Sequence, residues 1–353
     1  MSHPAEHDLA GVIHVHSLYS DGTGTVAEIA AAAEVNDLDF VLLTDHDTLR
    51  AKQNGEEGWH DSVLVLVGEE VSPSSGGHYL AFGIDRVIDH KGLDGHAIIE
   101  RVNESGGFGF LSHPFSKGSE RFNRPPMSWT AMDSTGYTGL ELWSFVTDGA
   151  EKISRISDIF RFIATPGRFV DQPPLVNLET WDRLCAGRRC VALGGIDAHQ
   201  VGIRIGDRVP LRLMAYKRSF RYLRTHLLTG EPLRGELEPD RESVYGALRD
   251  GHAYIAMDSL APARGFCFSA KAGNKELIMG DEVQAGKNPW LLRAQLPQPA
   301  HIKLVRDGQS IAQSEGAVFE HEATGPGVYR VEVQLQVKGR LHTWILSNPI
   351  YLR

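Results

Sequence analysis

The chain has 353 residues, of which 42% are hydrophobic and 23% are charged, an ordinary composition for a globular protein. Its 45 acidic and 36 basic residues give a net charge of −9, and no run of lysine and arginine marks a surface for a nucleic-acid backbone. A stable nucleic-acid complex is therefore not expected, although a nucleotide could still be a substrate.

The sequence also argues against export and membrane insertion. Residues 1–9 are polar and lack the apolar core of a signal peptide, and no apolar stretch approaches the ~20 residues that span a bilayer. Cys185, Cys190 and Cys267 have no paired spacing, which favours small buried side chains in a reducing compartment. We expect a cytoplasmic protein without membrane contact, and the sequence leaves open whether it forms a homo-oligomer.

The first two thirds of the chain alternate short apolar runs with helical stretches, as in βα repeats. Residues 11–15 predict a strand and the alanine-rich residues 26–35 predict a helix. Residues 63–67 form a continuous Val/Leu run of the kind that parallel strands bury on both faces. Further strands are predicted at residues 40–43, 108–111, 140–143 and 191–193.

Two later features complete the predicted organisation. Residues 116–190, rich in arginine, proline and aromatic residues, resemble an insertion over one face, and residues 218–228 and 243–249 predict helices. After residue 258 the pattern changes to alternating segments, at residues 265–270, 290–296 and 327–337. We therefore predict a barrel domain over residues 1–258 and a small antiparallel β-sandwich over residues 259–353.

Six of the apolar runs end in, or contain, a residue type that binds metal ions. The first run gives His14 and His16, whose spacing of two places both imidazoles on one side of a strand. In a parallel barrel the loops after the strands converge at one mouth, so residues far apart in sequence meet there. The other candidates are Asp21, Asp45, His46, Glu70, His78, His113, Glu141, Asp197 and His199.

The residue types indicate the metals. Histidine and carboxylate ligands without thiolates suit zinc, manganese or iron, and their number exceeds what one ion needs. Each motif alone has a structural explanation: His14 and His16 could be incidental, Asp45 could cap a helix, and Glu70 could be a solvated loop residue. Their common position at strand ends argues against that explanation for the whole set.

The motifs in order resemble those of the PHP (polymerase and histidinol phosphatase) family. The resemblance spans about residues 11–200 and rests on His14-Val15-His16-Ser17, Ser20-Asp21-Gly22, Thr44-Asp45-His46-Asp47, Gly68 to Ser72, Ser112-His113-Pro114 and Asp197-Ala198-His199. It implies a distorted (β/α)7 TIM-like barrel and two or three divalent ions (Mn, Zn or Fe). The segments around Tyr254 and Trp344 resemble the two-domain branch that includes carbaryl-hydrolase-like metallohydrolases.

The resemblance also implies a division of the ligands among three ions. His14, His16, Glu70 and Asp197 would hold one ion. Glu70 would bridge to a second ion completed by His78 and His113, and Asp21, His46 and His199 would hold a third.

The chemistry expected from such a site is hydrolysis of a small phosphorylated molecule by a hydroxide held between two ions. His199 and Asp45 are the candidates for acid–base or orienting roles. Arg121 and Arg124 in the insertion, and Arg204 shortly after His199, are the candidates for binding the phosphate, because guanidinium pairs with it through two hydrogen bonds.

Two other functions compete with the phosphoesterase. The same metals could hydrolyse a carboxyl ester or carbamate, which would gain little from arginines near the mouth. A non-catalytic PHP binding module is the third alternative, and the retention of ligand-capable residues at all nine positions argues against it.

Overall fold

The computed structural model describes residues 7–200, 214–286 and 288–353 and shows a mixed α/β fold, as the sequence predicts. Within these residues the strands form one large sheet of 14 strands and a second sheet of five, and neither sheet closes on itself. A closed (β/α)7 barrel is therefore not seen in the hydrogen bonding. No helix in the described part of the chain is long and apolar enough to cross a membrane.

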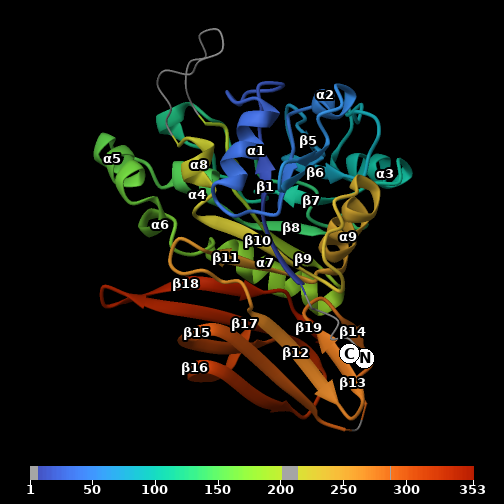
Figure 1. Cartoon of the computed structure of the whole chain (residues 1–353), viewed down its shortest axis with the longest axis vertical. Coiled ribbons are helices and arrows are strands. Elements are labelled where there is room, and N and C mark those ends of the chain that lie inside the picture. Colours follow the sequence, from blue (N-terminus) through green and yellow to red (C-terminus); the bar gives the residue numbers. More distant parts are fainter. Residues whose placement is uncertain (1–6, 201–213, 287) are drawn as a thin grey trace.

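Three neighbouring parallel strands lie near one end of the large sheet, and the first of them is labelled β1 in the upper half of Figure 1. They are β1 (His7–Val15), β2 (Phe40–Leu43) and β4 (Val63–Val67), and β3 (Gly58–His60) pairs with β4 in the antiparallel direction. All residues of β2 and β4 are buried. This burial explains their continuous apolar sequences, because both faces of each strand are covered.

The second sheet combines antiparallel and parallel pairing. Its order is β5 (Glu69–Val71), β6 (His78–Phe82), β7 (Phe108–Ser112), β8 (Gly139–Ser144) and β9 (Val191–Gly195). β6 runs antiparallel to β5 and β7, whereas β7, β8 and β9 are parallel. Because of this reversal, the first residue of β6 lies at the same sheet edge as the last residues of its neighbours.

Two isolated bridges join the sheets beside the candidate site. One pairs Val15 with Ala198, and the other pairs His46 with Glu70. Both bridges lie at the carboxyl ends of strands or in the loops that follow. The ends of strands from both sheets therefore meet at one place.

The helices start and stop at recognisable signals. α1 (Val26–Glu34) opens with a capping box in which Thr25 and Glu28 exchange hydrogen bonds, and α3 (Gly95–Glu104) is capped by Asp94. α9 (Leu237–Asp250) ends at Gly251, whose left-handed backbone favours glycine. The others are α2 (Arg50–Gln53), the 3-10 helix η1 (Glu120–Phe122), α4 (Phe145–Glu151), α5 (Ile156–Ala164), α6 (Pro166–Phe169), α7 (Leu175–Gly187) and α8 (Tyr216–Ser219).

The helix predicted over residues 218–228 is wrong. The chain forms only the short α8 there and then the strand β10 (Leu223–Thr229), which lies between β1 and β11 (Ala253–Met257) with antiparallel pairing to both. The Thr225 hydroxyl also accepts from Gly194 N and donates to Gly194 O, at 3.0 and 2.9 Å. These long-range hydrogen bonds override the local helical preference of the segment.

The C-terminal strands are joined to the large sheet by hydrogen bonds, and the β-sandwich expected over residues 259–353 stays a prediction. β18 (Arg340–Ser347) pairs with β11, and β17 (Gly327–Val337) pairs with β18, so hydrogen bonding is continuous from β1 to the C-terminal region. This region also has its own apolar core around Phe268, Trp290 and Trp344. The remaining strands are β12 (Cys267–Ala272), β13 (Lys275–Ile278), β14 (Glu282–Val283), β15 (Trp290–Arg306), β16 (Gln309–Ala323) and β19 (Ile350–Leu352).

A buried polar network joins β1, β10 and β11. The His226 imidazole lies 2.8 Å from Asp8 Oδ1 through Nδ1 and 3.4 Å from Asp258 Oδ2 through Nε2, and the Tyr254 hydroxyl donates to Asp8 Oδ2 at 2.6 Å. Burial disfavours the charged imidazole, but Asp258 and Asp8 outweigh it and raise the pKa of His226. Burial likewise disfavours the charged Asp8 carboxylate, but His226 outweighs it and lowers the pKa of Asp8.

We predict that His226→Gln destabilises the protein by about 2 kcal/mol at pH values below 6.5, with a smaller effect at higher pH, because it removes a buried charged partner. The stabilisation from the raised pKa of His226 is complete below the unfolded value of 6.5 and is lost as pH rises through the folded value. Denaturant unfolding of both proteins from pH 5 to pH 9 measures the difference. A difference that grows with rising pH would contradict the prediction.

Candidate metal centre

The structure brings all nine predicted metal ligands into one continuous cluster. Each histidine of the cluster has a ring nitrogen within 3.7 Å of a carboxylate oxygen of another member. Each carboxylate likewise has an oxygen within 3.7 Å of a histidine nitrogen. The members are His14, His16, Asp21, His46, Glu70, His78, His113, Asp197 and His199.

The Glu70 carboxylate is the centre of the cluster and separates its histidines into two sets. Oε1 lies 2.9 Å from His78 Nδ1 and 3.3 Å from His113 Nε2. Oε2 lies 3.1 Å from His14 Nε2, 3.3 Å from His16 Nε2 and 3.2 Å from His46 Nδ1. A carboxylate with each oxygen facing a different set of imidazoles has the arrangement needed to bridge two ions.

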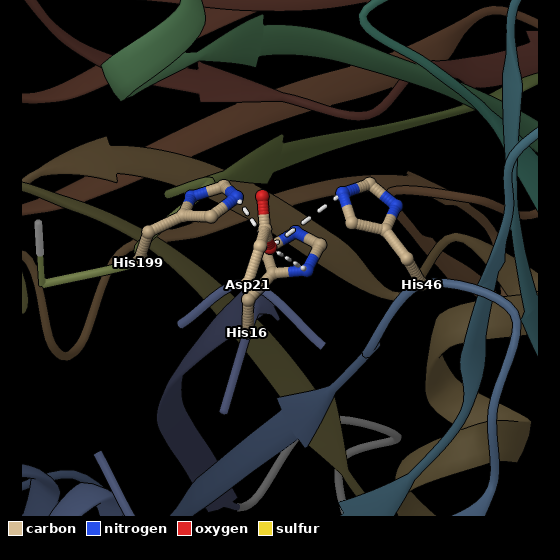
Figure 2. Close-up of side chains that lie close together, drawn as sticks. All are labelled: His16, Asp21, His46 and His199. Carbon is tan, nitrogen blue, oxygen red and sulfur yellow. Dashed lines mark ion pairs between the residues drawn. The ribbon is translucent and has the colours of Figure 1, made fainter. Parts of the chain in front are cut away.

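A second carboxylate, Asp21, gathers the solvent-facing part of the cluster. Figure 2 shows His16, His46 and His199 directed toward Asp21, whose Oδ1 lies 3.7, 3.7 and 3.1 Å from their respective nitrogens. The Asp21 side chain is 51% exposed, whereas His16 and His199 are buried. This set is therefore the part of the cluster that a solute reaches most directly.

Asp197 closes the inner side. Its Oδ1 lies 3.4 Å from His14 Nε2 and 3.5 Å from His16 Nε2, and its Oδ2 accepts a short hydrogen bond from the Thr147 hydroxyl. Among the residues that the structure describes, three sets of ligand atoms are compact enough to hold an ion, with all the atoms of a set within 4.8 Å of one another. These sets are His14, His16 and Glu70; His46, Glu70 and His78; and His16, Asp21, His46 and His199.

These sets overlap with the grouping implied by the family resemblance but differ from it in four places. His16 belongs to the Asp21 set as well as to the His14 set, and His46 joins Glu70 and His78 as well as Asp21. His113 lies near Glu70 Oε1 and Asp197 lies near His14, but both are outside the three compact sets.

Backbone conformation contributes to the convergence. His14, His113 and Asp197 have φ values of 68°, 27° and 52°, in the region that side-chain-bearing residues rarely adopt. At His14 the pairing of β1 with β2 shifts register between Ile13 and Val15. The two imidazoles of the first motif thus meet through a strained bulge instead of the regular alternation that the sequence predicts.

The electrostatics of the cluster fit bound cations. His16 is fully buried, and burial, followed by the charge on His199, lowers its pKa to about 3, so its imidazole is neutral at physiological pH. Neither His16 ring nitrogen has a hydrogen-bond partner among the described residues. Burial disfavours the charged forms of Glu70 and Asp197, but the surrounding histidines outweigh it and lower both pKa values. Burial disfavours the charged imidazoles of His14, His113 and His199, but neighbouring carboxylates outweigh it and raise their pKa values, so a bound metal ion would compete with protons for these nitrogens.

Asp45 lies behind the cluster and positions the loop that carries Asp21. Its Oδ1 accepts from Ser17 N at 2.7 Å and from the Ser20 hydroxyl at 2.6 Å, and its Oδ2 accepts from the Ser17 hydroxyl at 2.6 Å. Both carboxylate oxygens are therefore engaged by this loop.

The sequence marks Glu141 as a candidate but assigns it to none of the three ions. Its Oε1 lies 3.1 Å from His14 Nδ1, and its Oε2 accepts from His113 N at 2.7 Å. A carboxylate on the far nitrogen of a ligand imidazole fixes the ring and its tautomer. The fit is close, because a Cβ on the neighbouring Gly195 would lie 1.8 Å from Glu141 Oε1. The position of Glu141 in a predicted strand was the signal available from the sequence.

The predicted phosphate-binding arginines are not all at the cluster. Arg124 lines a cavity that has His199 in its wall, whereas Arg121 is exposed and is not among the residues lining that cavity. Arg204 lies outside the described residues.

The fold and the site together define an α/β protein with a histidine and carboxylate cluster of the kind that binds divalent metal ions. No protein-family model matches the chain. Over 120 residues it is 28% identical to an uncharacterized protein of Methanocaldococcus jannaschii, a match that covers 30% of this chain and 67% of the relative.

Among solved structures, the chain is similar to a two-domain protein of Bacteroides vulgatus containing a predicted PHP-like metal-dependent phosphoesterase (14% identity, 98% and 97% of the two chains, TM-score 0.47). It is also similar to a proposed metal-dependent phosphoesterase of Bifidobacterium adolescentis (18%, 58% and 92%, 0.36). An amidohydrolase of Chromobacterium violaceum with bound sulfate is a third (14%, 57% and 90%, 0.30).

The PHP-like description of the first structure names the family that the sequence motifs resemble. At these identities and TM-scores the similarities define neither a substrate nor a reaction. The relation to the carbaryl-hydrolase-like branch stays a prediction.

We predict that Glu70→Gln loses most of its bound divalent metal, because a neutral amide cannot bridge cations as a carboxylate does. Asp21→Asn should lose only the ion at the solvent-facing set. Metal per chain, measured by mass spectrometry after dialysis against manganese or zinc, distinguishes the two losses.

Glu69→Gln is the matched control for this experiment. Burial raises the pKa of Glu69 to about 8, so its side chain is already neutral at pH 7 and resembles glutamine. It should keep the wild-type metal content, and equal metal loss in the Glu69 and Glu70 variants would contradict the assignment.

We predict that Glu141→Gln weakens metal binding by about 10–100-fold, the usual effect of removing a carboxylate that orients a ligand histidine. Competition with a chromophoric chelator measures the affinity. Asp148→Asn is the control, because Asp148 is another buried carboxyl group, its Oδ2 accepts from Ser144 N at 3.1 Å, and burial raises its pKa well above its usual value. A wild-type affinity in the Glu141 variant would show that His14 needs no such support.

Proposed function

We propose that this chain is a metal-dependent phosphoesterase of the PHP type, acting on a small phosphorylated molecule. The observation that carries the proposal is the Glu70 carboxylate, which has two imidazole nitrogens near Oε1 and three near Oε2. The bridged pair of sheets is compatible with a distorted form of the barrel that the family resemblance implies.

The residues divide into ligands and positioning groups. We assign the nine clustered histidines and carboxylates as ligands of two or three ions, with Glu70 shared between ions. When bound, divalent ions lower the pKa of water and neutralise charge that develops on phosphoryl oxygens. Asp45 and Glu141 act through other residues, holding the Asp21 loop and the His14 ring respectively.

In this proposal the reacting group of the substrate lies at the solvent-facing set around Asp21. Asp21 and His199 lie where a solute can approach, and Arg124 lines the adjoining cavity. We assign Arg124 to bind the anionic substrate and His199 to the metal. Because both Asp45 oxygens already accept hydrogen bonds from the Ser17–Ser20 loop, we assign Asp45 a positioning role instead of a proton-transfer role.

A hydrolase of carboxyl esters or carbamates is the second candidate. The mostly apolar cavity beside His199 is the observation that favours it, because a neutral ester would need no cationic partner. The two candidates share the metal cluster and differ in the group that is cleaved.

The test is hydrolysis of p-nitrophenyl phosphate, bis-p-nitrophenyl phosphate and p-nitrophenyl acetate by the manganese-loaded protein. We expect cleavage of a phosphate ester, at least ~10²-fold slower after chelation or in Glu70→Gln. Glu69→Gln should retain wild-type rates. Hydrolysis of the acetate alone would replace the phosphoesterase with the second candidate, and no hydrolysis by metal-loaded protein would support a binding module.

A further inference from the structure

A cavity of about 350 Å³ adjoins the cluster on the side of the 116–163 segment. Its walls are mostly apolar, which is unexpected beside so many charged groups. Three residues with aliphatic or aromatic side chains come from α5, at the outer edge of the molecule in Figure 1. The principal lining residues are Val146, Ile153, Ile159, Phe162, Ile163 and His199.

The cavity is continuous with the metal centre. Its lining includes Ala198 and His199, which follow directly after Asp197, and Thr147, whose hydroxyl donates to Asp197 Oδ2. His199 Nε2 is also 3.1 Å from Asp21 Oδ1. A molecule whose reacting group lies at the solvent-facing set would therefore have the cavity beside it for the rest of its structure.

The walls of the cavity are held by packing that involves no ligand. The Phe162 ring lies 6.2 Å from the Phe145 ring and 5.7 Å from the Phe169 ring, measured between centroids. α4 and α5 approach closely at Gly149, where a Cβ would lie 2.6 Å from the Phe162 ring. The hollow is therefore formed by supported helices, and it is ready for an apolar group.

Arg124 is a cation at the edge of the cavity, and Glu151 and His199 are the other ionisable residues that line it in the described part of the chain. Glu151 lines it, but Oε1 of this carboxylate already accepts from the Ser116 hydroxyl at 2.8 Å and from Lys117 N at 2.7 Å. The Arg124 side chain is exposed and makes no ion pair with the described residues. An anionic group would meet this guanidinium at the edge of an otherwise apolar space.

We propose that the substrate is a phosphate monoester of an apolar alcohol, whose hydrocarbon group occupies this cavity; the proposal rests on the phosphoesterase function above. The volume is roughly twice the ~150 Å³ that admits benzene in an apolar cavity, so a branched chain or a bicyclic aromatic group fits. Hydrolysis breaks the P–O bond to the alcohol, water supplies the new oxygen on phosphorus, and the leaving oxygen takes a proton, giving the alcohol and inorganic phosphate.

The test is a series of ethyl, butyl and hexyl phosphates with the manganese-loaded protein, followed by phosphate release. Each buried methylene should raise kcat/KM roughly fourfold, so hexyl phosphate should exceed ethyl phosphate on the order of 10²-fold. Equal kcat/KM values along the series would overturn the proposal while leaving the phosphoesterase function intact.

Matched variants in α5 test whether the cavity causes the preference for the longer alkyl chain. Ile159→Asn and Ile163→Asn change half-buried residues that line the cavity, and each should reduce the preference for hexyl phosphate at least ~10-fold. Ile156→Asn makes the same change at a residue of α5 that is 59% exposed and outside the lining, and it should keep wild-type values. A lining variant that keeps the full preference, with a wild-type melting temperature, would overturn the proposal.

A binding measurement tests the apolar cavity independently of the hydrolysis reaction. Hexylphosphonate and methylphosphonate carry the same anionic group and cannot be hydrolysed as esters, and calorimetry should show tighter binding of the hexyl compound by on the order of 10³-fold. If no phosphate ester of any length is cleaved but this difference is found, the phosphoesterase function fails and the apolar binding site stands. Equal binding of the two phosphonates overturns the apolar site itself.

Discussion

The site depends on one interaction, the contact of the buried Glu70 carboxylate with five imidazoles. A carboxylate removed from water is expensive unless cations or hydrogen bonds replace its hydration. Without metal ions, protonated histidines supply that charge. Burial disfavours the charged imidazoles of His14 and His113, but Glu70 outweighs it and raises their pKa values, whereas burial lowers the pKa of His16 to about 3. Metal ions bound among these residues would stabilise the buried Glu70 carboxylate in the same way. The positive φ angles of His14, His113 and Asp197 are a further cost of the same arrangement.

The ligand-capable residues could be identified from sequence because their residue types and their position after apolar runs are local properties. His14, His46 and His199 each follow such a run, and the meeting of strand ends brings them together. The direction of β6 could not be predicted in this way. His78 starts its strand, and it reaches Glu70 because β6 runs antiparallel to β5. Pairing direction is set by long-range hydrogen bonds, which a local pattern does not encode.

Long-range hydrogen bonds, which a local sequence pattern does not encode, also explain the other differences between the predicted and the observed structure. Residues 218–228 carry no strong strand signal, yet β10 forms because β1 and β11 offer it hydrogen-bonding partners on both sides. The change of pattern after residue 258 was visible, but the pairing of β18 with β11 that continues the large sheet was not. The role of Glu141 cannot be assigned from the sequence for a similar reason. Its role depends on His14, which is 127 positions away in the chain and contacts it only after folding.

Residues 197–200, which follow β9, contribute both to the cluster and to the lining of the adjoining cavity. Asp197 and His199 belong to the cluster, while Ala198, His199 and Gln200 line the cavity. α4 has the same double position, since Thr147 supports Asp197 and Val146 faces the cavity. The outer wall, from Ser116 to Ile163, supplies no member of the nine-residue cluster. Under the proposed function, substitutions in α5 would change which organic group is accepted without altering a ligand, whereas changes at Glu141, at Thr147 or at residues 197–200 would also affect the cluster. The cluster would then set the type of chemistry, and α5 would be free to set the substrate.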